Sequence, residues 1–283
     1  MLLIALVLNL ISFPDSSLLV LSKEVTGFKY AKSVTVDGRG SIFVLDRETS
    51  EISKFDKDLN LLTKSGGIGW GQNQFVSPEY IDASSGLDIL VSDYQNNRIQ
   101  RLDLKLSFVS ELNTEELTFP DEYKVRFPKA TLVVNSKDIY VIDGNNPRVV
   151  IFKNGQTPVS VFGGFGSGDA ELIEPHKILK NGDNLLFILD KGRNSIMKFD
   201  NFGNFRGKIE KDNIISISMY DNILYILLDE EVWLFNTISN QFDSVISIPH
   251  EINVKKITDF LVYNRNMYLL LTHKSLSSWK LEQ

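Results

Sequence analysis

The chain of 283 residues contains no cysteine. This absence excludes disulfide bonds, thiolate nucleophiles, cysteine-ligated zinc or iron–sulfur sites and a cysteine-linked lipid anchor. It does not assign a compartment, because a domain of this length can bury a core that is stable without disulfide bonds. Hydrophobic residues make up 43% of the chain and aromatic residues 11%, a composition typical of a globular protein.

Concentrated positive charge is also missing. The 30 Lys and Arg residues stand against 36 Asp and Glu residues, and the basic residues are scattered singly along the chain. The net charge is −6. Because phosphate contacts need a concentrated positive surface, the composition argues against nucleic acid as the partner unless folding gathers a local basic patch.

Long hydrophobic runs are scarce, and the most apolar stretch, Leu2 to Phe13, is too short to span a bilayer. It resembles the hydrophobic region of a signal peptide, but no Lys or Arg precedes it and no A-x-A site follows. We expect residues 1–16 to be a signal peptide, which would make the protein periplasmic or extracellular. The alternative is an uncleaved, partly buried apolar N-terminal segment.

Catalytic motifs are missing as well, since there is no serine nucleophile elbow, no Walker sequence and no recognisable pair of carboxylates. The glycine-rich stretches Gly67–Gly71 and Gly164–Gly168 resemble phosphate loops. A phosphate loop needs a helix start directly after its glycines, whereas Pro78 and Pro175 lead into predicted strands here. We therefore interpret these glycines as positions that allow positive φ, and no cofactor is predicted.

A calcium loop is excluded in the same way. Asp56, Asp58 and Asn60 have the spacing of its first ligands, but Leu61 and Gly67 stand where Gly and a bidentate Glu are required. The stretch is predicted to be a hairpin turn.

The sequence is rich in short apolar strands that repeat. The clearest copy runs from Ile89 to Asp103: an apolar strand ending in Asp93, a polar turn, Arg98 and a second strand. The corresponding aspartates recur at separations of 47, 50, 47 and 39 residues, at Asp46, Asp93, Asp143, Asp190 and Asp229. A period of this size with four strands per unit predicts the blades of an all-β propeller.

Six copies of the repeat can be recognised, but the sixth has only three strands, within residues 256–281. The strand-like segment Ser17 to Val25 has no sequential partner and can supply the missing strand, which would close the ring and protect its edge. We therefore predict that residues 17–283 form one six-bladed β-propeller with four-stranded blades, closed by an N-terminal strand that joins the last blade.

The repeat resembles the NHL repeat, most clearly in VSDYQNNRIQRLD, VIDGNNPRVVIFK and LDKGRNSIMKFD. The connectors GGIGWGQNQFVSP and FGGFGSGDAELIEP are similar to the family's glycine-rich links between blades. The resemblance covers nearly all of the chain after residue 16 and is weakest in the last two blades. It implies a six-bladed propeller that binds proteins, peptides, glycans or RNA through one face, so function must be argued from a site.

The Asp–turn–Arg element is interpreted as structural, because an Asp at a strand end can accept backbone N–H groups and the following Arg can bind its carboxylate. A further hypothesis is that Arg98, Arg148 and Arg193 line an arc that selects acidic partners. It requires their guanidinium groups to be exposed.

Recognition is predicted where the connectors and the turns between second and third strands converge on one face of the ring. The candidate binding residues there are Trp70, Tyr94, Arg98, Asn145, Arg148, Phe165, His176 and Arg193. Aromatic residues beside Arg are typical of recognition surfaces. The alternative is that Trp70 and Phe165 only cover the blade junctions.

The family resemblance extends to the amidating lyases, which hold a metal in the channel with histidines from several blades. The three histidines, His176, His250 and His273, do not occupy equivalent positions in the repeat. No metal site is therefore predicted. We expect a non-catalytic binding or scaffold module for a protein, peptide or glycan partner, and the alternative is a metal-dependent lyase or hydrolase at the channel.

Overall fold

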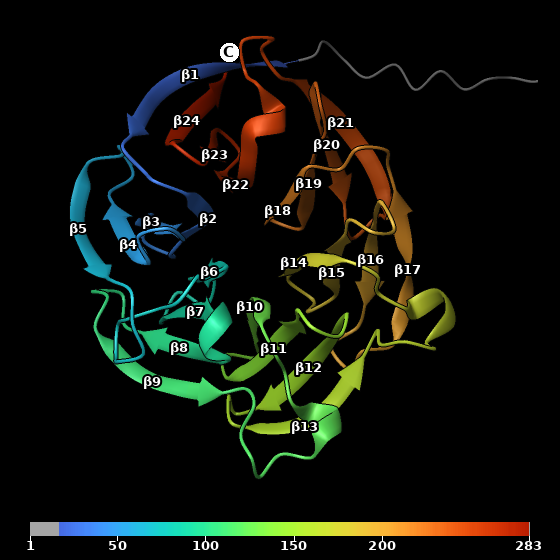
Figure 1. Ribbon diagram of the computed structural model, residues 1–283. Coiled ribbons are helices and arrows are strands. Elements are labelled where there is room, and N and C mark those ends of the chain that lie inside the picture. The colour runs from blue at the N-terminus through green and yellow to red at the C-terminus, as the bar shows by residue number, and fades with distance from the viewer. Residues whose placement is uncertain (1–16, 283) are drawn as a thin grey trace, which may run out of the picture.

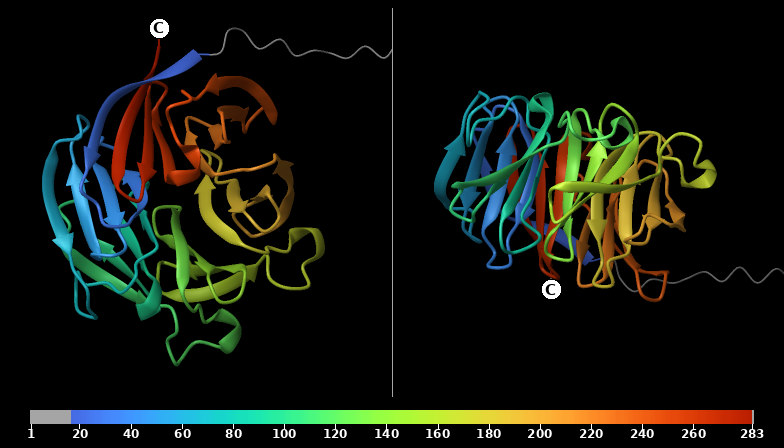
Figure 2. Two further views of the ribbon diagram at one scale, coloured as in Figure 1. Left: turned by 45° about the horizontal axis from the view of Figure 1, so that its top comes forward. Right: turned by 90° about the horizontal axis from the view of Figure 1, so that it is seen from below.

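The structure is a computed structural model that describes residues 17–282, and the predicted signal peptide lies outside these residues. Within this range the chain forms 24 β-strands and four short 3-10 helices. The strands lie in sheets arranged as a ring, with β2, β6, β10, β14, β18 and β22 innermost (Figure 1). Seen edge-on, the ring has two faces where strands turn back (Figure 2, right).

Four of the sheets have four strands each, in chain order from the centre outward. Their strands are β2 (Ala31–Val36), β3 (Ile42–Asp46), β4 (Glu51–Phe55) and β5 (Leu61–Gly66); β6 (Tyr80–Asp82), β7 (Ile89–Asp93), β8 (Arg98–Leu102) and β9 (Phe108–Asn113); β10 (Pro128–Val134), β11 (Asp138–Asp143), β12 (Arg148–Lys153) and β13 (Thr157–Phe162); β14 (Pro175–Lys180), β15 (Leu186–Asp190), β16 (Ser195–Phe199) and β17 (Phe205–Glu210).

The remaining eight strands form one sheet in the order β18-β19-β20-β21-β1-β24-β23-β22. Their bounds are β18 (Ser216–Tyr220), β19 (Ile223–Leu227), β20 (Glu231–Asn236), β21 (Gln241–Ser247), β1 (Ser17–Thr26), β22 (Ile257–Asn264), β23 (Met267–Thr272) and β24 (Ser275–Leu281). The 3-10 helices are η1 (Tyr94–Asn96), η2 (Asp121–Tyr123), η3 (Gly168–Ala170) and η4 (Val254–Lys256).

The prediction of six separate four-stranded blades is correct for four sheets and wrong for the last eight strands. The reason is β1, which pairs in parallel with β21 through Ser17 and Leu18 and then runs antiparallel to β24. One strand thus belongs to two neighbouring groups of strands and joins them into a single sheet.

Closure by the N-terminal strand is confirmed. β1 pairs with β24 from Leu19 opposite Leu281 to Thr26 opposite Ser275. Leu19 is 1% exposed and packs in a core cluster with residues of β21 and β23. The two ends of the described chain are therefore held together by hydrogen bonds and by apolar contacts.

The burial of each strand in its sheet follows from its sequence pattern. The second strands β3, β7 and β15 are buried along their whole length, as uninterrupted apolar runs predict for strands covered on both faces. The fourth strand β5 is mostly exposed and carries Thr, Lys and Ser after its two leucines. The core fills the spaces between neighbouring sheets, where residues of β7 and β8 pack against residues of β10, β11 and β12.

No helix among the described residues has the length and apolar character needed to cross a membrane.

Candidate functional site

Strands alternate in direction within each sheet, so the turns after the second strands and the connectors between sheets lie on the same face. We call this the connector face. Hydrogen bonds confirm the arrangement: Asp93, at the end of β7, accepts the N–H of Val76 in the preceding connector. Asp190, at the end of β15, accepts the N–H groups of Ile173 and Glu174. The interpretation of these aspartates as structural is thereby confirmed.

The three arginines of the repeat hold the connectors. Arg98 is buried, binds Asp93 at 2.8 Å and donates to the carbonyl groups of Trp70, Gly71 and Gln74.

The other two arginines make comparable contacts. Arg148 binds Asp143 and the carbonyl of Lys124, and Arg193 donates to the carbonyl of Glu171. Arg98 and Arg148 are thus held against their aspartates, whereas Arg193 is half-buried and binds connector carbonyls without binding Asp190 through its side chain. An exposed arc of all three arginines is not what the structure shows, because these guanidinium groups satisfy connector carbonyls.

The glycines of the connectors behave largely as expected. Gly67, Gly166 and Gly168 have φ values of 137°, 84° and 60°, a region that L side chains rarely adopt. Gly71 and Gly164 do not have positive φ.

The hairpin predicted after β4 is confirmed. Asp56 accepts the N–H groups of Asp58 and Asn60. The hydrogen bond from the backbone of Asn60, followed by the one from its side chain, holds the pKa of Asp56 below its usual value.

Large apolar side chains stand exposed on three consecutive connectors. Trp70 is 79% exposed and Ile68 70% exposed on the connector after β5. Leu117, 89% exposed, lies on the next connector, and Phe165, 98% exposed, on the one after β13. We call these four residues the apolar arc. Trp70 and Phe165 therefore do not act as covers over the blade junctions.

Of two other predicted residues, Tyr94 is held by the scaffold through its side chain and Asn145 only through its backbone. The half-buried ring of Tyr94 stacks on Phe127 with a centroid separation of 5.1 Å, and the guanidinium of Arg47 lies 5.8 Å from its centre. Asn145 is exposed, and its backbone N–H binds Asp143.

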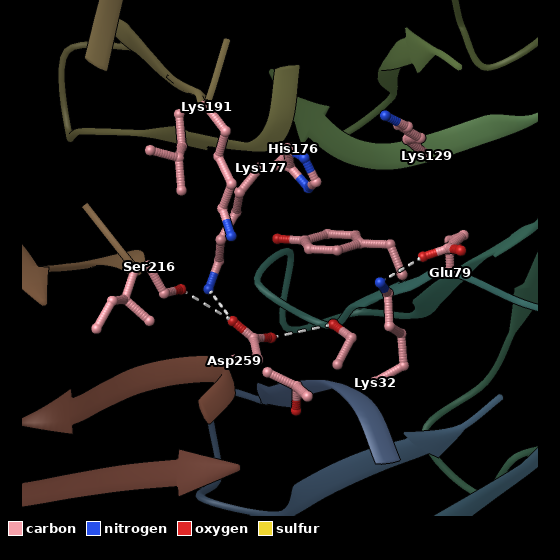
Figure 3. Close-up of a pocket in the computed structure, with 13 residues that line it drawn as sticks. Lys32, Glu79, Lys129, His176, Lys177, Lys191, Ser216 and Asp259 are labelled. Atoms are coloured by element: carbon pink, nitrogen blue, oxygen red, sulfur yellow. Dashed lines mark hydrogen bonds and ion pairs between the residues drawn. The ribbon is translucent and has the colours of Figure 1, made fainter. Parts of the chain in front are cut away.

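At the centre of the connector face, the innermost strands surround a cavity of about 190 Å³, which we call the channel mouth (Figure 3). Four lysines line it against two carboxylates, those of Glu79 and Asp259; the lysines are Lys32, Lys129, Lys177 and Lys191. Glu79 already binds two cations, Lys32 at 2.9 Å and Arg47. Positive charge is thus in excess at this place, although the protein as a whole is acidic.

Asp259 ties together strands from four parts of the ring at the floor of the cavity. It binds Nζ of Lys177 from β14 at 2.6 Å. It also accepts the hydroxyl of Ser216 from β18 and the hydroxyl of Ser33 and N–H of Val34 from β2. Lys177 is 7% exposed, so this is a buried ion pair with nearly complete hydrogen bonding.

The channel continues below this floor. A second cavity of about 390 Å³ is lined by residues that include Asp82 and Tyr263, and Tyr80 and Lys177 line both cavities.

His176 is the one predicted binding residue that lines the channel mouth. Its Nε2 lies 3.0 Å from a carboxylate oxygen of Glu174. Burial, and then the nearby ammonium groups of Lys191 and Lys129, hold the pKa of His176 below its usual value, against the opposing effect of Glu174. Burial and the charge of Lys32 likewise lower the pKa of Lys191.

The other histidines lie elsewhere. His273 stacks on Tyr30 at 3.9 Å, and His250 lies in the turn after β21. Within residues 17–282, no three His, Cys, Asp or Glu side chains are grouped in a way that could hold a metal ion.

Sequence reasoning missed Lys32 and Lys129 of the channel mouth because β-bulges put them there. The strand register shifts by one residue at Lys32 in β2, at Lys129 in β10, at His176 in β14 and at Thr258 in β22. A bulge turns a side chain away from the regular alternation, and all four bulged residues line the channel mouth. The available signal was their shared position, two residues into each first strand.

Comparison with solved structures identifies the architecture. A structure of streptogramin B lyase has 14% sequence identity and a TM-score of 0.66, with 93% of this chain and 98% of that chain covered. Virginiamycin B lyase from Staphylococcus aureus has 13% identity and a TM-score of 0.65, with 93% and 100% covered. A chain from a nidogen/laminin complex has 15% identity and a TM-score of 0.58, with 78% and 81% covered.

The protein folds as a β-propeller. The identities to these structures are low enough that the likeness concerns the fold of the propeller alone. No family model matches the propeller sequence, and no curated protein matches it.

Proposed function

We propose that the protein is a non-catalytic, NHL-type binding propeller of six blade units that engages a protein partner through its connector face. The apolar arc carries this proposal. Large exposed apolar side chains that gather on one face are typical of interaction surfaces, and these four lie on connectors of the same face. Here they lie on loops that are rigidly fastened to the scaffold, since Arg98 holds the backbone of Trp70 itself.

A protein suits this surface better than a glycan does. Ile68 and Leu117 are aliphatic and accompany the two aromatic residues, and such a mixture packs well against apolar side chains of a partner. Fixed connectors also lose little conformational entropy on binding. A chain of similar fold comes from the structure of a nidogen/laminin complex, which is consistent with a propeller that binds protein.

The proposed binding can be tested by site-specific cross-linking followed by affinity measurement. A photoreactive phenylalanine at position 165 should capture a partner in the native cells, and one at position 202 on the opposite face should not. Phe202 is 74% exposed and provides a matched control. The captured protein is then purified, and its Kd is measured with each variant by calorimetry.

Trp70→Ala and Phe165→Ala should each raise Kd about tenfold or more, because truncating a buried interface aromatic costs on the order of 1–2 kcal/mol. Phe202→Ala should leave Kd unchanged. Equal capture from both faces, or unchanged affinity in the two arc variants, contradicts the proposal.

An enzyme centred on the channel is the alternative. It is favoured by the His176–Glu174 pair in a hollow lined by Lys191 and by the fold shared with two lyases. One solved structure contains a catalytically inactive virginiamycin B lyase with quinupristin. The protein can be incubated with quinupristin and the products analysed by mass spectrometry. If quinupristin is converted, and His176→Ala abolishes the conversion, the protein is an enzyme and the binding proposal is wrong.

Export is also proposed, on the basis of the apolar segment Leu2 to Phe13. Mass spectrometry of protein from the envelope and culture medium should then find a mature N-terminus near residue 17. A full-length cytoplasmic chain would contradict it.

A further inference from the structure

The channel mouth has features that binding through the apolar arc does not explain. Four of the innermost strands carry a bulge at the same position, and the bulged residues are Lys32, Lys129, His176 and Thr258. Bulges interrupt the hydrogen-bond ladder and are found preferentially where a side chain must be aimed at a functional site. In this ring they aim two lysines and a histidine at one cavity.

The charge at the channel mouth is not balanced internally. Lys177 is neutralised by Asp259, and Lys32 shares Glu79 with Arg47. The ammonium groups of Lys129 and Lys191 have no hydrogen bond or ion pair within residues 17–282. The carboxylate of Glu174 acts on both lysines but forms an ion pair with neither, and the positive charge of Lys32 acts on Lys191. A bound anion would relieve this repulsion between like charges in one hollow.

The cavity is also large enough for such an anion. Its volume of about 190 Å³ is more than ten times the roughly 15 Å³ that one water molecule requires. The side chain of Lys191 extends into the cavity toward the Lys177–Asp259 pair, and Lys129 lies at its far side (Figure 3). Both lysines line the same hollow as His176, whose Nε2 is directed at Glu174.

We propose that the channel mouth is a binding site for an oxyanion with at least two negative charges, such as a phosphate or a polycarboxylate. Lys129 and Lys191 bind its oxygen atoms, while the N–H of His176 stays engaged with Glu174 at the neighbouring bulge. The buried Lys177–Asp259 pair forms the floor and fixes the depth to which the anion enters. The site is independent of the apolar arc, so binding of a protein partner and binding of an anion can each fail without the other.

The anion has two possible sources, a free small molecule or an acidic segment of a protein. Calorimetric titrations with inorganic phosphate, with citrate and with a capped hexaglutamate peptide distinguish them. Binding of phosphate or citrate but not of the peptide assigns the site to a small molecule, and the reverse result assigns it to an acidic segment. If none of the three probes binds with a Kd below about 1 mM, the proposal is wrong.

The variants Lys129→Ala and Lys191→Ala locate the binding. Each should weaken it at least fivefold, because each removes one of the two unpaired charges. Lys57→Ala, in the exposed turn after β4, is the matched control with an unchanged Kd. Neither channel lysine has a partner, so both variants should fold, which thermal melting verifies. Binding that is equally strong in all three variants lies elsewhere on the protein and overturns the proposal.

Discussion

At the scale of single residues, lysine has different roles at different points of the ring. Lys177 forms a buried ion pair with Asp259, whereas Lys191 extends into the same cavity without a partner among the described residues. His176 lines the same cavity and is affected by charges of both signs. Its pKa reports the balance between burial, the two lysines Lys191 and Lys129, and the carboxylate of Glu174.

NMR titration of the imidazole signals should therefore give His176 a pKa below 6.5. Lys191→Ala should raise this pKa, because it removes a repelling charge, and Glu174→Gln should lower it further. Since the unfolded chain takes up the proton first as pH falls, this histidine makes the fold less stable as pH drops through about 6.5 toward the folded-state pKa. A folded-state pKa at or above 6.5 would contradict the proposed electrostatics of the channel mouth.

At the scale of elements, β1 decides how the ring is closed. It is the outermost strand beside β24 and also pairs with the end of β21. Leu19 is the one buried residue among residues 18–26 of this strand, at 1% exposure, whereas Val20 is 45% and Leu21 48% exposed. Closure thus depends on the burial of particular side chains as well as on backbone hydrogen bonds.

Leu19→Ala should lower the free energy of unfolding by about 2–5 kcal/mol, the usual cost of truncating a fully buried leucine. Leu21→Ala, two residues along the same strand, should change it by about 0.5 kcal/mol or less. Denaturant unfolding of both variants provides the measurement. Deletion of residues 17–25 should destabilise the whole domain, and a deleted protein with unchanged melting behaviour would refute closure by β1.

At the scale of the whole molecule, the ring is held at its centre as well as at its rim. Asp259 in β22 contacts β2, β14 and β18, so a single carboxylate joins innermost strands that are far apart in the sequence. Removing one partner of a buried ion pair leaves the other charge without compensation, which is more costly than removing both.

Asp259→Asn should therefore lower the free energy of unfolding by about 3–5 kcal/mol at pH 7. The double variant with Lys177→Met should recover part of this loss, because no charge then remains unpaired. Asp221→Asn, which breaks the exposed pair with Arg265, should cost about 1 kcal/mol or less. If the two single variants are equally stable in guanidinium unfolding, Asp259 does not hold the ring together.

The sequence by itself determined the repeating strands, the aspartates that accept connector N–H groups and the strand that closes the ring. These features are local: apolar runs, turn residues and their spacing are visible in the order of residues, and Asp93 and Arg98 are five positions apart. The apolar arc could also be proposed from sequence, because Trp70 and Phe165 stand in glycine-rich connectors.

Only the tertiary structure decided that Arg98, Arg148 and Arg193 donate hydrogen bonds to those connectors. It also decided that the last eight strands form one sheet. It also brought Lys32, Lys129, Lys177 and Lys191 around one cavity. These lysines are scattered over 160 residues of an acidic chain, and no local pattern connects them. Lys32, Lys129 and Lys177 meet because a closed ring brings the first strand of every unit to the same axis, and bulges turn Lys32, Lys129 and His176 toward it. Lys191 joins them from the turn after the second strand β15.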